Sequence, residues 1–318
     1  MSPSLQQPDA LVLGAGVIGL VTAWRLRAQG LSVEVWTRDD PGQTTSAVAG
    51  AIWYPFLAEP RERVAGWSAF TFQRLRELAG DPVAGVHMQS VVEVFDHAEP
   101  DLWWASEVPG LVRLAGDEVP VGYRAAVRVD VPVCEVPVHM KWLLRGLQQQ
   151  GVAVVRREVA SLDEALDVAG IVVNCTGLAA RELCGDAELQ AVRGQVLRLE
   201  TAAVPYAWID DTQGGPCYLI PRKDGLVVGG TAQMADERTA VDAGDTEAIM
   251  ARAIRAFPQL AGAKVLATRV GLRPYRSTVR LEEPPRSDGR RLIHNYGHGG
   301  SGYTLAWGCA EDVAALLG

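Results

Sequence analysis

The sequence predicts a protein of the α/β class, in which a doubly wound parallel-sheet domain is interleaved with an α+β domain built on an antiparallel sheet. Near the N-terminus, an apolar strand runs through a glycine-rich turn into a helix and a second strand, which is the βαβ unit of a doubly wound sheet. Three strand-like runs between residues 195 and 230 fit an antiparallel sheet. The chain closes with another strand, glycine-rich loop and helix, so the two domains are predicted to alternate along the chain.

The first half of the chain is expected to supply most of the parallel strands. Residues 10–13 are apolar throughout, as in a buried parallel strand, and the helical pattern after them ends near Gly30, where a helix C-terminal glycine is expected. Residues 41–62 are irregular, and such a long irregular segment usually has a function or wraps a ligand. The other predicted strands are residues 31–36, 91–95, 123–131, 153–156 and 171–175, and the other predicted helices are residues 65–78, 98–108 and 137–150.

The second half is expected to supply the antiparallel sheet and the C-terminal helix. Pro258 lies just beyond a helical pattern and ends it. The predicted strands are residues 195–199, 217–221, 226–229 and 291–295, the predicted helices are residues 246–257 and 303–317, and a loop covers residues 296–302.

Composition and charge exclude several classes of protein. The 318 residues, of which 48% are hydrophobic and 21% charged, suffice for one large or two modest domains and do not fit a disordered, collagen-like or disulfide-rich chain. The net charge of −8 argues against nucleic acid as a partner, and no apolar run approaches the length of a membrane span. Five scattered cysteines without a C-x-x-C pair favour the reducing cytoplasm.

The turn after the first strand carries the glycines of a dinucleotide-binding site. Gly14 permits a tight turn, Gly16 lets the backbone approach a pyrophosphate, and Gly19 permits close packing of the helix on the strand. The helix N-terminus then presents free N–H groups to the phosphates. Three glycines alone are weak evidence, but their position between a strand and a helix favours dinucleotide binding over a chance turn.

The end of the second predicted strand leaves the identity of the dinucleotide open. The acidic residue that usually holds the ribose is missing from its expected place. Arg38 would suit the 2′-phosphate of NADP, whereas Asp39 or a backbone group would hold unmodified ribose hydroxyls.

Two further loops have the composition of ligand-binding segments. Residues 44–51 place three hydroxyls before a run of small residues, which suits passage along a flat ligand, although a polar surface loop has the same composition. Residues 294–304 run from a strand through four glycines into a helix, whose N-terminus can face an oxygen that becomes negative during a reaction. His294 and His298 lie in this loop and not on one helix face, so they are interpreted as structural and no metal site is predicted.

Residues 271–276 contain an arginine directly before a proline. Pro274 holds Arg273 in extended backbone, a geometry that suits two-point capture of a carboxylate. Because the chain has many other arginines, a structural or solvated role is the default interpretation of this residue without further context.

Together these segments resemble the D-amino-acid oxidase family of FAD flavoproteins over nearly the whole chain. The similarity is most specific at Gly-Leu-Arg-Pro, residues 271–274, and at His-Asn-Tyr-Gly-His-Gly-Gly, residues 294–300. It extends to residues 12–20, 44–46, 51–55, 173–177, 193–195 and 218–221. The resemblance implies FAD as the cofactor, an FAD-binding domain from residues 1–56, 137–190 and 265–318, and a substrate-binding domain from residues 57–136 and 191–264.

The resemblance also implies a reaction. FAD would take a hydride from Cα of a D-amino acid, the imino acid would hydrolyse to a 2-oxo acid and ammonia, and O2 would be reduced to hydrogen peroxide. No side chain acts as an obligatory general base in this family. Arg273 matches the arginine that binds the substrate carboxylate, Tyr218 the tyrosine that adds a bond to it, and Gly300 the glycine whose carbonyl accepts from the amine. Tyr54 and Ser301 are expected in the substrate pocket.

The family pattern implies cofactor-binding residues in the glycine turns, the second strand end and the hydroxyl-rich loop. The expected residues are Gly14, Ala15, Gly16, Val17, Ile18, Gly19, Arg38, Asp39, Thr44, Thr45, Ser46, Gly50, Ala51, Ile52, Val159, Thr176, Gly177, Arg273, Gly299, Gly300, Ser301, Gly302, Tyr303 and Thr304.

Three departures from the family pattern bear on the substrate. Some members carry a lid tyrosine four residues before the position of Tyr218, where this chain has Gly214 within residues 213–216, so the lid is expected to be short or differently built. Tyr54 replaces a glutamine found in some relatives. The D-aspartate-preferring branch adds a basic residue where this chain has Asp210 and Asp211, so acidic substrates are expected to be disfavoured.

The sequence therefore predicts oxidative deamination of neutral D-amino acids. The alternatives are a glycine- or sarcosine-type amine oxidase, a D-aspartate oxidase, a quinone-linked dehydrogenase and a non-catalytic flavin-binding protein. Tyr218 and Arg273 argue against the last, since a scaffold needs no carboxylate clamp. The expected partners are a D-amino acid and O2, without nucleic acid or membrane; a cytoplasmic location is expected, and a homodimer is one assembly that the sequence allows.

Overall fold

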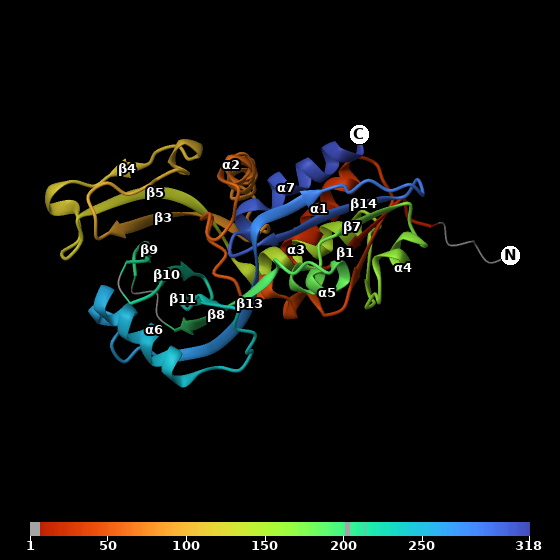
Figure 1. Cartoon of the computed structure of the whole chain (residues 1–318). Coiled ribbons are helices and arrows are strands. Elements are labelled where there is room, and N and C mark those ends of the chain that lie inside the picture. Colours follow the sequence, from red (N-terminus) through yellow and green to blue (C-terminus); the bar gives the residue numbers. More distant parts are fainter. Residues whose placement is uncertain (1–6, 201–203, 213) are drawn as a thin grey trace.

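One large sheet organises the chain, whose computed structural model describes residues 7–200, 204–212 and 214–318 (Figure 1). Its strands are β1 (Ala10–Leu13), β2 (Val33–Thr37), β3 (Val86–Phe95), β4 (Val112–Arg113), β5 (Ala125–Cys134), β6 (Ala153–Arg156), β7 (Ile171–Asn174), β8 (Gln190–Leu199), β9 (Ala207–Asp210), β10 (Cys217–Arg222), β11 (Gly225–Gly229), β12 (Gln233–Met234), β13 (Val265–Glu282) and β14 (Arg291–His298). The strand order is β4-β5-β3-β9-β10-β11-β8-β13-β14-β7-β1-β2-β6, and β12 pairs with β8. The helices are α1 (Val17–Ala28), α2 (Arg61–Leu78), α3 (Val136–Gln149), α4 (Leu162–Leu166), α5 (Ala180–Cys184), α6 (Ala243–Ala256) and α7 (Gly302–Leu317).

The parallel part of the sheet has helices on both faces, as predicted. β14, β7, β1, β2 and β6 are neighbours in that order and pair in parallel. Side chains alternate between faces along a strand, so Ala10 and Val12 join the core under α1, α3 and α7, whereas Leu11 and Leu13 join a second core with α4. This is the doubly wound arrangement.

The rest of the sheet is mainly antiparallel. β8, β10, β11 and β13 pair antiparallel with their neighbours, and α6 packs across one face of them (Figure 1). β13 also pairs with β14, so the antiparallel part continues directly into the parallel part. The division into the two predicted domains therefore remains a prediction.

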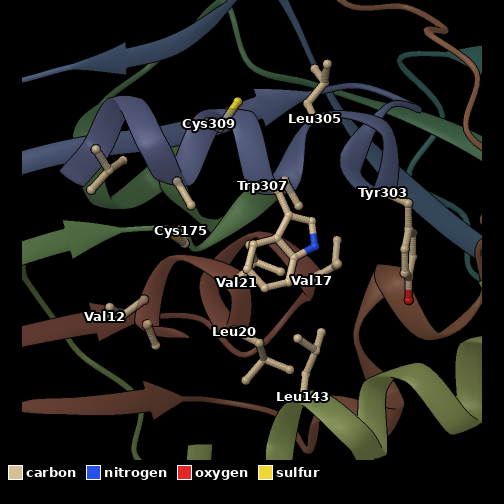
Figure 2. Packing of buried hydrophobic residues seen from close by; sticks show 14 of the residues in the cluster. Val12, Val17, Leu20, Val21, Leu143, Cys175, Tyr303, Leu305, Trp307 and Cys309 are labelled. Atoms are coloured by element: carbon tan, nitrogen blue, oxygen red, sulfur yellow. The ribbon is translucent and has the colours of Figure 1, made fainter. Parts of the chain in front are cut away.

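Packing in the core places the N-termini of α1 and α7 next to each other. Figure 2 shows Trp307 of α7 among Val21 and Leu20 of α1 and Leu143 of α3. At their N-termini, a Cβ on Gly302 would lie 3.5 Å from Cγ1 of Val17. Two helix N-termini thus lie side by side and face the same region of the molecule.

Several predicted elements need correction. The predicted helix at residues 98–108 is wrong, because the segment is a loop with one short turn of 3₁₀ helix, Ala105–Glu107. Trp104 is its buried anchor and packs against Trp53. Several strands extend further than predicted, and β9 and the 18-residue β13 were not predicted. Across the described ranges, no helix has both the length and the apolar character needed to cross a membrane.

Candidate active site

A single elongated cavity of about 720 Å³ brings the predicted loops together. The carboxyl ends of β1, β2 and β7 border it on one side, and β10 and β13 border it on the other. Ligands of doubly wound folds bind at this strand edge, and ligand cavities commonly have volumes of about 300–1,000 Å³. The fold therefore places the cavity where a nucleotide cofactor is expected.

The glycine turn after β1 forms the floor of the cavity at the N-terminus of α1. Gly14 has φ +103°, and a Cβ there would lie 2.5 Å from the carbonyl oxygen of Cys175. A Cβ on Gly19 would overlap the carbonyl oxygen of Gly14. Both positions therefore require glycine, and the first turn of α1 lies close under the strand end.

The hydroxyl-rich loop lies directly on this helix N-terminus. The N–H of Val17 donates to Oγ of Ser46 at 3.0 Å, and the Oγ1 of Thr45 donates to the carbonyl of Leu272 at 3.0 Å. Gly50 lies so close to Ile220 that a Cβ would approach its Cδ1 to 2.7 Å. The loop therefore connects the glycine turn to β10 and β13 along one wall of the cavity.

The far end of the cavity, beyond β2, carries charged groups. Arg38 and Asp39 form an ion pair at 2.9 Å, and the carboxylate of Asp39 raises the pKa of that guanidinium. The guanidinium of Arg157 lies over the ring of Trp36, 3.8 Å from its centroid. Because Arg38 is already paired with Asp39, it is not a free anchor for a 2′-phosphate.

Arg273 and Tyr218 meet at the opposite end. Arg273, on β13, donates through Nη1 to the carbonyl of Thr231 at 2.9 Å. Its guanidinium lies over Gly194 of β8, where a Cβ would come within 2.5 Å of its Cζ. Tyr218, on β10, lies in the same way over Gly229 of β11, where a Cβ would overlap its ring. Two glycines on neighbouring strands thus make room for the two predicted carboxylate-binding side chains.

Burial controls the protonation of Tyr218. Desolvation raises the pKa of the Tyr218 phenol above its ordinary value, while the positive charge of Arg273 acts in the opposite direction. The phenol therefore stays protonated at neutral pH and can donate a hydrogen bond, which suits a carboxylate partner and not a general base.

The last glycine-rich loop covers this end of the cavity. Gly299 has φ +54° and Gly300 packs on Phe56, whose Cδ1 would lie 2.6 Å from a Cβ at that position. Phe56 in turn lies beneath Arg273, with the guanidinium carbon 5.9 Å from the ring centroid. The backbone of Gly300 and the side chain of Arg273 therefore border the same small volume.

Tyr54 also lines the cavity, and a buried carboxylate holds it. Its hydroxyl donates to Oε1 of Glu93 at 2.5 Å. Burial raises the pKa of Glu93 from 4.5 to about 7, although the hydrogen bond from Tyr54 opposes this shift. The outer pocket thus contains a polar pair whose carboxyl group, that of Glu93, titrates near neutral pH.

Most, but not all, of the predicted site residues line the cavity. Gly19, Ser301 and Thr304 do not: Gly19 packs under the turn, and the two hydroxyls bind backbone instead. Oγ of Ser301 accepts from the N–H of Phe56 at 2.7 Å, and Oγ1 of Thr304 accepts from the N–H of Tyr54 at 3.1 Å. Ser301 and Thr304 therefore shape the segment from Tyr54 to Phe56, and their expected contacts with substrate and cofactor stay predictions. The other predicted residues that line the cavity are Gly14, Ala15, Gly16, Val17, Ile18, Arg38, Asp39, Thr44, Thr45, Ser46, Gly50, Ala51, Ile52, Tyr54, Val159, Thr176, Gly177, Tyr218, Arg273, Gly299, Gly300, Gly302 and Tyr303.

Two further features of the site were not predicted from the sequence, and the predicted lid position lies partly outside the described residues. Phe56 and Gly194 both pack against Arg273. In the sequence, only their positions draw attention to them, since Phe56 lies in the irregular segment 41–62 and Gly194 in the family-like segment 193–195. His298 lines the cavity with its Nε2 unpartnered among the described residues, and burial lowers its pKa to about 3, so the ring is neutral. At the predicted lid position, Gln213 lies outside the described residues, and the carbonyl of Gly214 accepts from Arg252 at 3.1 Å.

A doubly wound sheet, a glycine turn under a helix N-terminus and, at the other end of the same cavity, the predicted carboxylate-binding pair are typical of a nucleotide-cofactor enzyme that acts on small acids. The chain belongs to the FAD dependent oxidoreductase family, whose model matches residues 9–316. It is 44% identical to a D-amino-acid oxidase of Rubrobacter xylanophilus, covering 97% of this chain and 95% of the relative. It is 41% identical to a D-amino-acid oxidase of Streptomyces coelicolor, covering 97% of this chain and 96% of the relative.

The fold has the same architecture as glycine oxidase from Geobacillus kaustophilus, with a TM-score of 0.81, 19% identity, and coverage of 98% of this chain and 94% of that one. The protein is therefore an FAD-dependent oxidoreductase, and the open choice of dinucleotide is resolved in favour of FAD.

The residues of the cavity fit this cofactor. Because Gly14 and Gly16 carry no side chains, a pyrophosphate can approach the backbone at the N-terminus of α1. Gly299 and Gly302 bring the N-terminus of α7 to the same cavity. The loop of residues 44–51 and the N-terminus of α7 would hold the flat flavin ring.

Proposed function

We propose that this enzyme catalyses the oxidative deamination of D-amino acids with uncharged side chains. The overall reaction converts the D-amino acid, O2 and water to a 2-oxo acid, ammonia and hydrogen peroxide. The observation that carries the proposal is the pairing of Arg273 with Tyr218 at one end of a cavity whose other end fits a nucleotide. The family relationship and the D-amino-acid oxidase relatives support the same reaction.

The chain's own residues bind and orient the substrate. Arg273 presents parallel N–H donors to the substrate carboxylate, and its contacts with Thr231 and Gly194 restrict its orientation. Tyr218, protonated because it is buried, donates a further hydrogen bond. The carbonyl of Gly300 would accept from the substrate amine. When bound, FAD supplies the acceptor for the hydride from Cα.

The surroundings of Arg273 and Tyr218 disfavour substrates whose side chain carries a carboxylate. A substrate with a second carboxylate would leave that group without a cation, since the described cavity lining contains Arg273 as its only positive side chain near Tyr218. Asp211 lies on the same lining and would repel it. D-aspartate and D-glutamate are therefore the less favourable substrates.

Oxygen consumption distinguishes this proposal from its alternatives. We expect the FAD-loaded enzyme to consume O2 and form hydrogen peroxide with D-alanine or D-valine, and not with the L-enantiomers. Preference for sarcosine or glycine would favour an amine oxidase of the glycine-oxidase type. Dye reduction without oxygen consumption would favour a dehydrogenase.

Location and assembly belong to the proposal as well. We propose a cytoplasmic enzyme because all five cysteines are free thiols, which suits a reducing compartment. The homodimer remains a prediction of the sequence.

A further inference from the structure

Two adjacent aspartates at the end of β9 have opposite surroundings. Asp210 is 2% exposed and accepts hydrogen bonds from Tyr123 at 2.6 Å and from the N–H and hydroxyl of Thr212 at 2.9 and 2.6 Å. Asp211 is exposed and lines the active-site cavity. Successive side chains of an extended chain point to opposite sides. Asp210 is therefore structural, whereas Asp211 is directed to the substrate.

Asp211 carries a negative charge that the described protein leaves uncompensated. Within residues 7–200, 204–212 and 214–318, its carboxylate forms no hydrogen bond or ion pair. The nearest positive side chain on the lining is Arg273, which lowers the pKa of Asp211 against the larger upward effects of desolvation and of Asp210. When Arg273 binds the substrate carboxylate, its positive charge is neutralised and no longer offsets the negative charge of Asp211.

A second carboxyl group, that of Glu93, lies on the same wall of the pocket and adds negative charge there as the pH rises through its pKa of about 7. Glu93 is 7% exposed, and while its Oε1 accepts from Tyr54, its Oε2 is buried without a partner among the described residues. A small void of about 10 Å³ borders Glu93, and Tyr54 and Ile209 line both this void and the main cavity. The charge of Asp211 also raises the pKa of Glu93, so the two carboxylates act on one region.

The complementary ligand is a cation held by the same substrate that Arg273 binds. The α-carboxylate and α-amine lie at Arg273 and Gly300, so the side chain is the free part of the substrate. A side-chain ammonium or guanidinium near Asp211 would form a charge-assisted pair, and an uncharged chain would leave the carboxylate unpaired. A side-chain carboxylate would be repelled.

We propose that Asp211 is a specificity-determining residue, which selects D-amino acids whose side chain ends in a cation, such as D-lysine, D-ornithine and D-arginine. The inference rests on the proposed oxidation of D-amino acids and extends its side-chain preference from uncharged to cationic side chains. The reaction is unchanged: two electrons and a proton leave Cα–H as a hydride, the amine loses a proton, and O2 takes up both electrons as hydrogen peroxide. The side-chain cation is not consumed.

The test compares kcat/KM for D-lysine and D-norleucine, which share a four-carbon side chain and differ by the terminal ammonium. In the unmodified enzyme, D-lysine should be at least as good a substrate as D-norleucine. In Asp211→Asn the ratio of kcat/KM for D-lysine to kcat/KM for D-norleucine should fall about five- to fiftyfold. This range lies between the effect of losing a solvent-exposed ion pair and that of losing a desolvated one. Asp211→Lys should lower this ratio further and raise the ratio of D-glutamate to D-norleucine.

The control is Asp130→Asn, which removes an exposed carboxylate on β5 outside the cavity lining and should leave the ratios unchanged. FAD content and circular dichroism of each variant verify that it is folded. Unchanged ratios in Asp211→Asn, or D-lysine oxidised a hundredfold more slowly than D-norleucine by the unmodified enzyme, would overturn the inference and leave the proposed function standing. Failure to oxidise either substrate would overturn both.

Discussion

At the scale of single residues, the proposed function gives Arg273 and Tyr218 different parts in substrate binding. Lysine cannot reproduce the fork of Arg273, so Arg273→Lys loses a shielded charge-assisted pair, worth about 2–5 kcal/mol when one partner is truncated. Both KM and the rate of hydride transfer should suffer, because the substrate is also misoriented. Tyr218→Phe loses one hydroxyl, worth roughly 0.5–1.5 kcal/mol for a neutral partner and up to about 3 for a charged one.

Stopped-flow flavin reduction separates the two variants. We expect Tyr218→Phe to retain reduction at lower efficiency, because the protonated phenol abstracts no proton. If Tyr218→Phe abolishes reduction while Arg273→Lys barely changes it, Tyr218 is an acid–base catalyst and the mechanism is wrong.

Glu93 should make the stability of the protein depend on pH. Its pKa rises from 4.5 to about 7 on folding, so between these values the folded state binds more protons than the unfolded state. Stability contributed by the neutral carboxyl is therefore present at low pH and is lost as the pH rises through this window. Relative to Glu93→Gln, the unmodified protein should lose about 1–3 kcal/mol between pH 5 and pH 8.

Denaturant unfolding of both proteins at the two pH values measures this difference. The buried histidines have lowered pKa values and change stability in the opposite direction, but they are common to both proteins and cancel. Glu118→Gln, at an exposed position, is the matched control. Parallel pH profiles for the unmodified protein and Glu93→Gln would show that Glu93 does not titrate in this window.

At the scale of elements, the packing of neighbouring strands positions the side chains of the site. β8 runs beside β13, and Gly194 leaves the space that the guanidinium of Arg273 occupies. Gly194→Ala should displace that guanidinium, because the added methyl group overpacks the site at a cost of about 1–3 kcal/mol. The KM for D-alanine should rise as a result. Gly170→Ala, where a Cβ meets nothing within 4 Å, is the control. An unchanged KM in Gly194→Ala would mean that Arg273 does not need this position to bind the carboxylate.

Elements with local signals were predicted well from the sequence. The glycine turn from β1 to α1 depends on residues only a few positions apart, and Pro274 fixes the extended backbone of Arg273 locally. By contrast, β13 is missed because it is mostly half-buried and mixes glycine, proline and arginine, so it lacks the alternation of a strand with one buried face. Its place is set by pairing with β8 and β14, which lie far away in the sequence.

The same limit applies to the site. The sequence shows Asp210 and Asp211 side by side, but only the structure distinguishes the buried, saturated carboxylate from the one on the cavity. Ser301 and Thr304 belong to a glycine-rich loop that reaches the cavity, yet their hydroxyls turn toward the backbone of residues 54–56. Side-chain direction at a helix N-terminus depends on tertiary partners, which a motif does not contain.

At the scale of the whole molecule, the cavity borders both the parallel and the antiparallel part of the sheet. A ligand that binds only the folded state stabilises it by about 2.7 kcal/mol when its free concentration is a hundred times Kd. Added FAD should therefore raise the thermal midpoint of the apoprotein by several degrees. Gly19→Ala, whose Cβ would overlap the carbonyl of Gly14, should lose this shift. An apoprotein whose thermal midpoint does not respond to FAD would contradict the proposed cofactor site.

The central claim is that one cavity holds FAD and a D-amino acid together. The most direct test is the visible spectrum of the purified, FAD-loaded enzyme before and after D-alanine is added without oxygen. We predict that the flavin absorbance is lost with D-alanine, remains with L-alanine, and returns when air is admitted. A flavin spectrum that D-alanine and D-valine leave unchanged under these conditions would contradict the account.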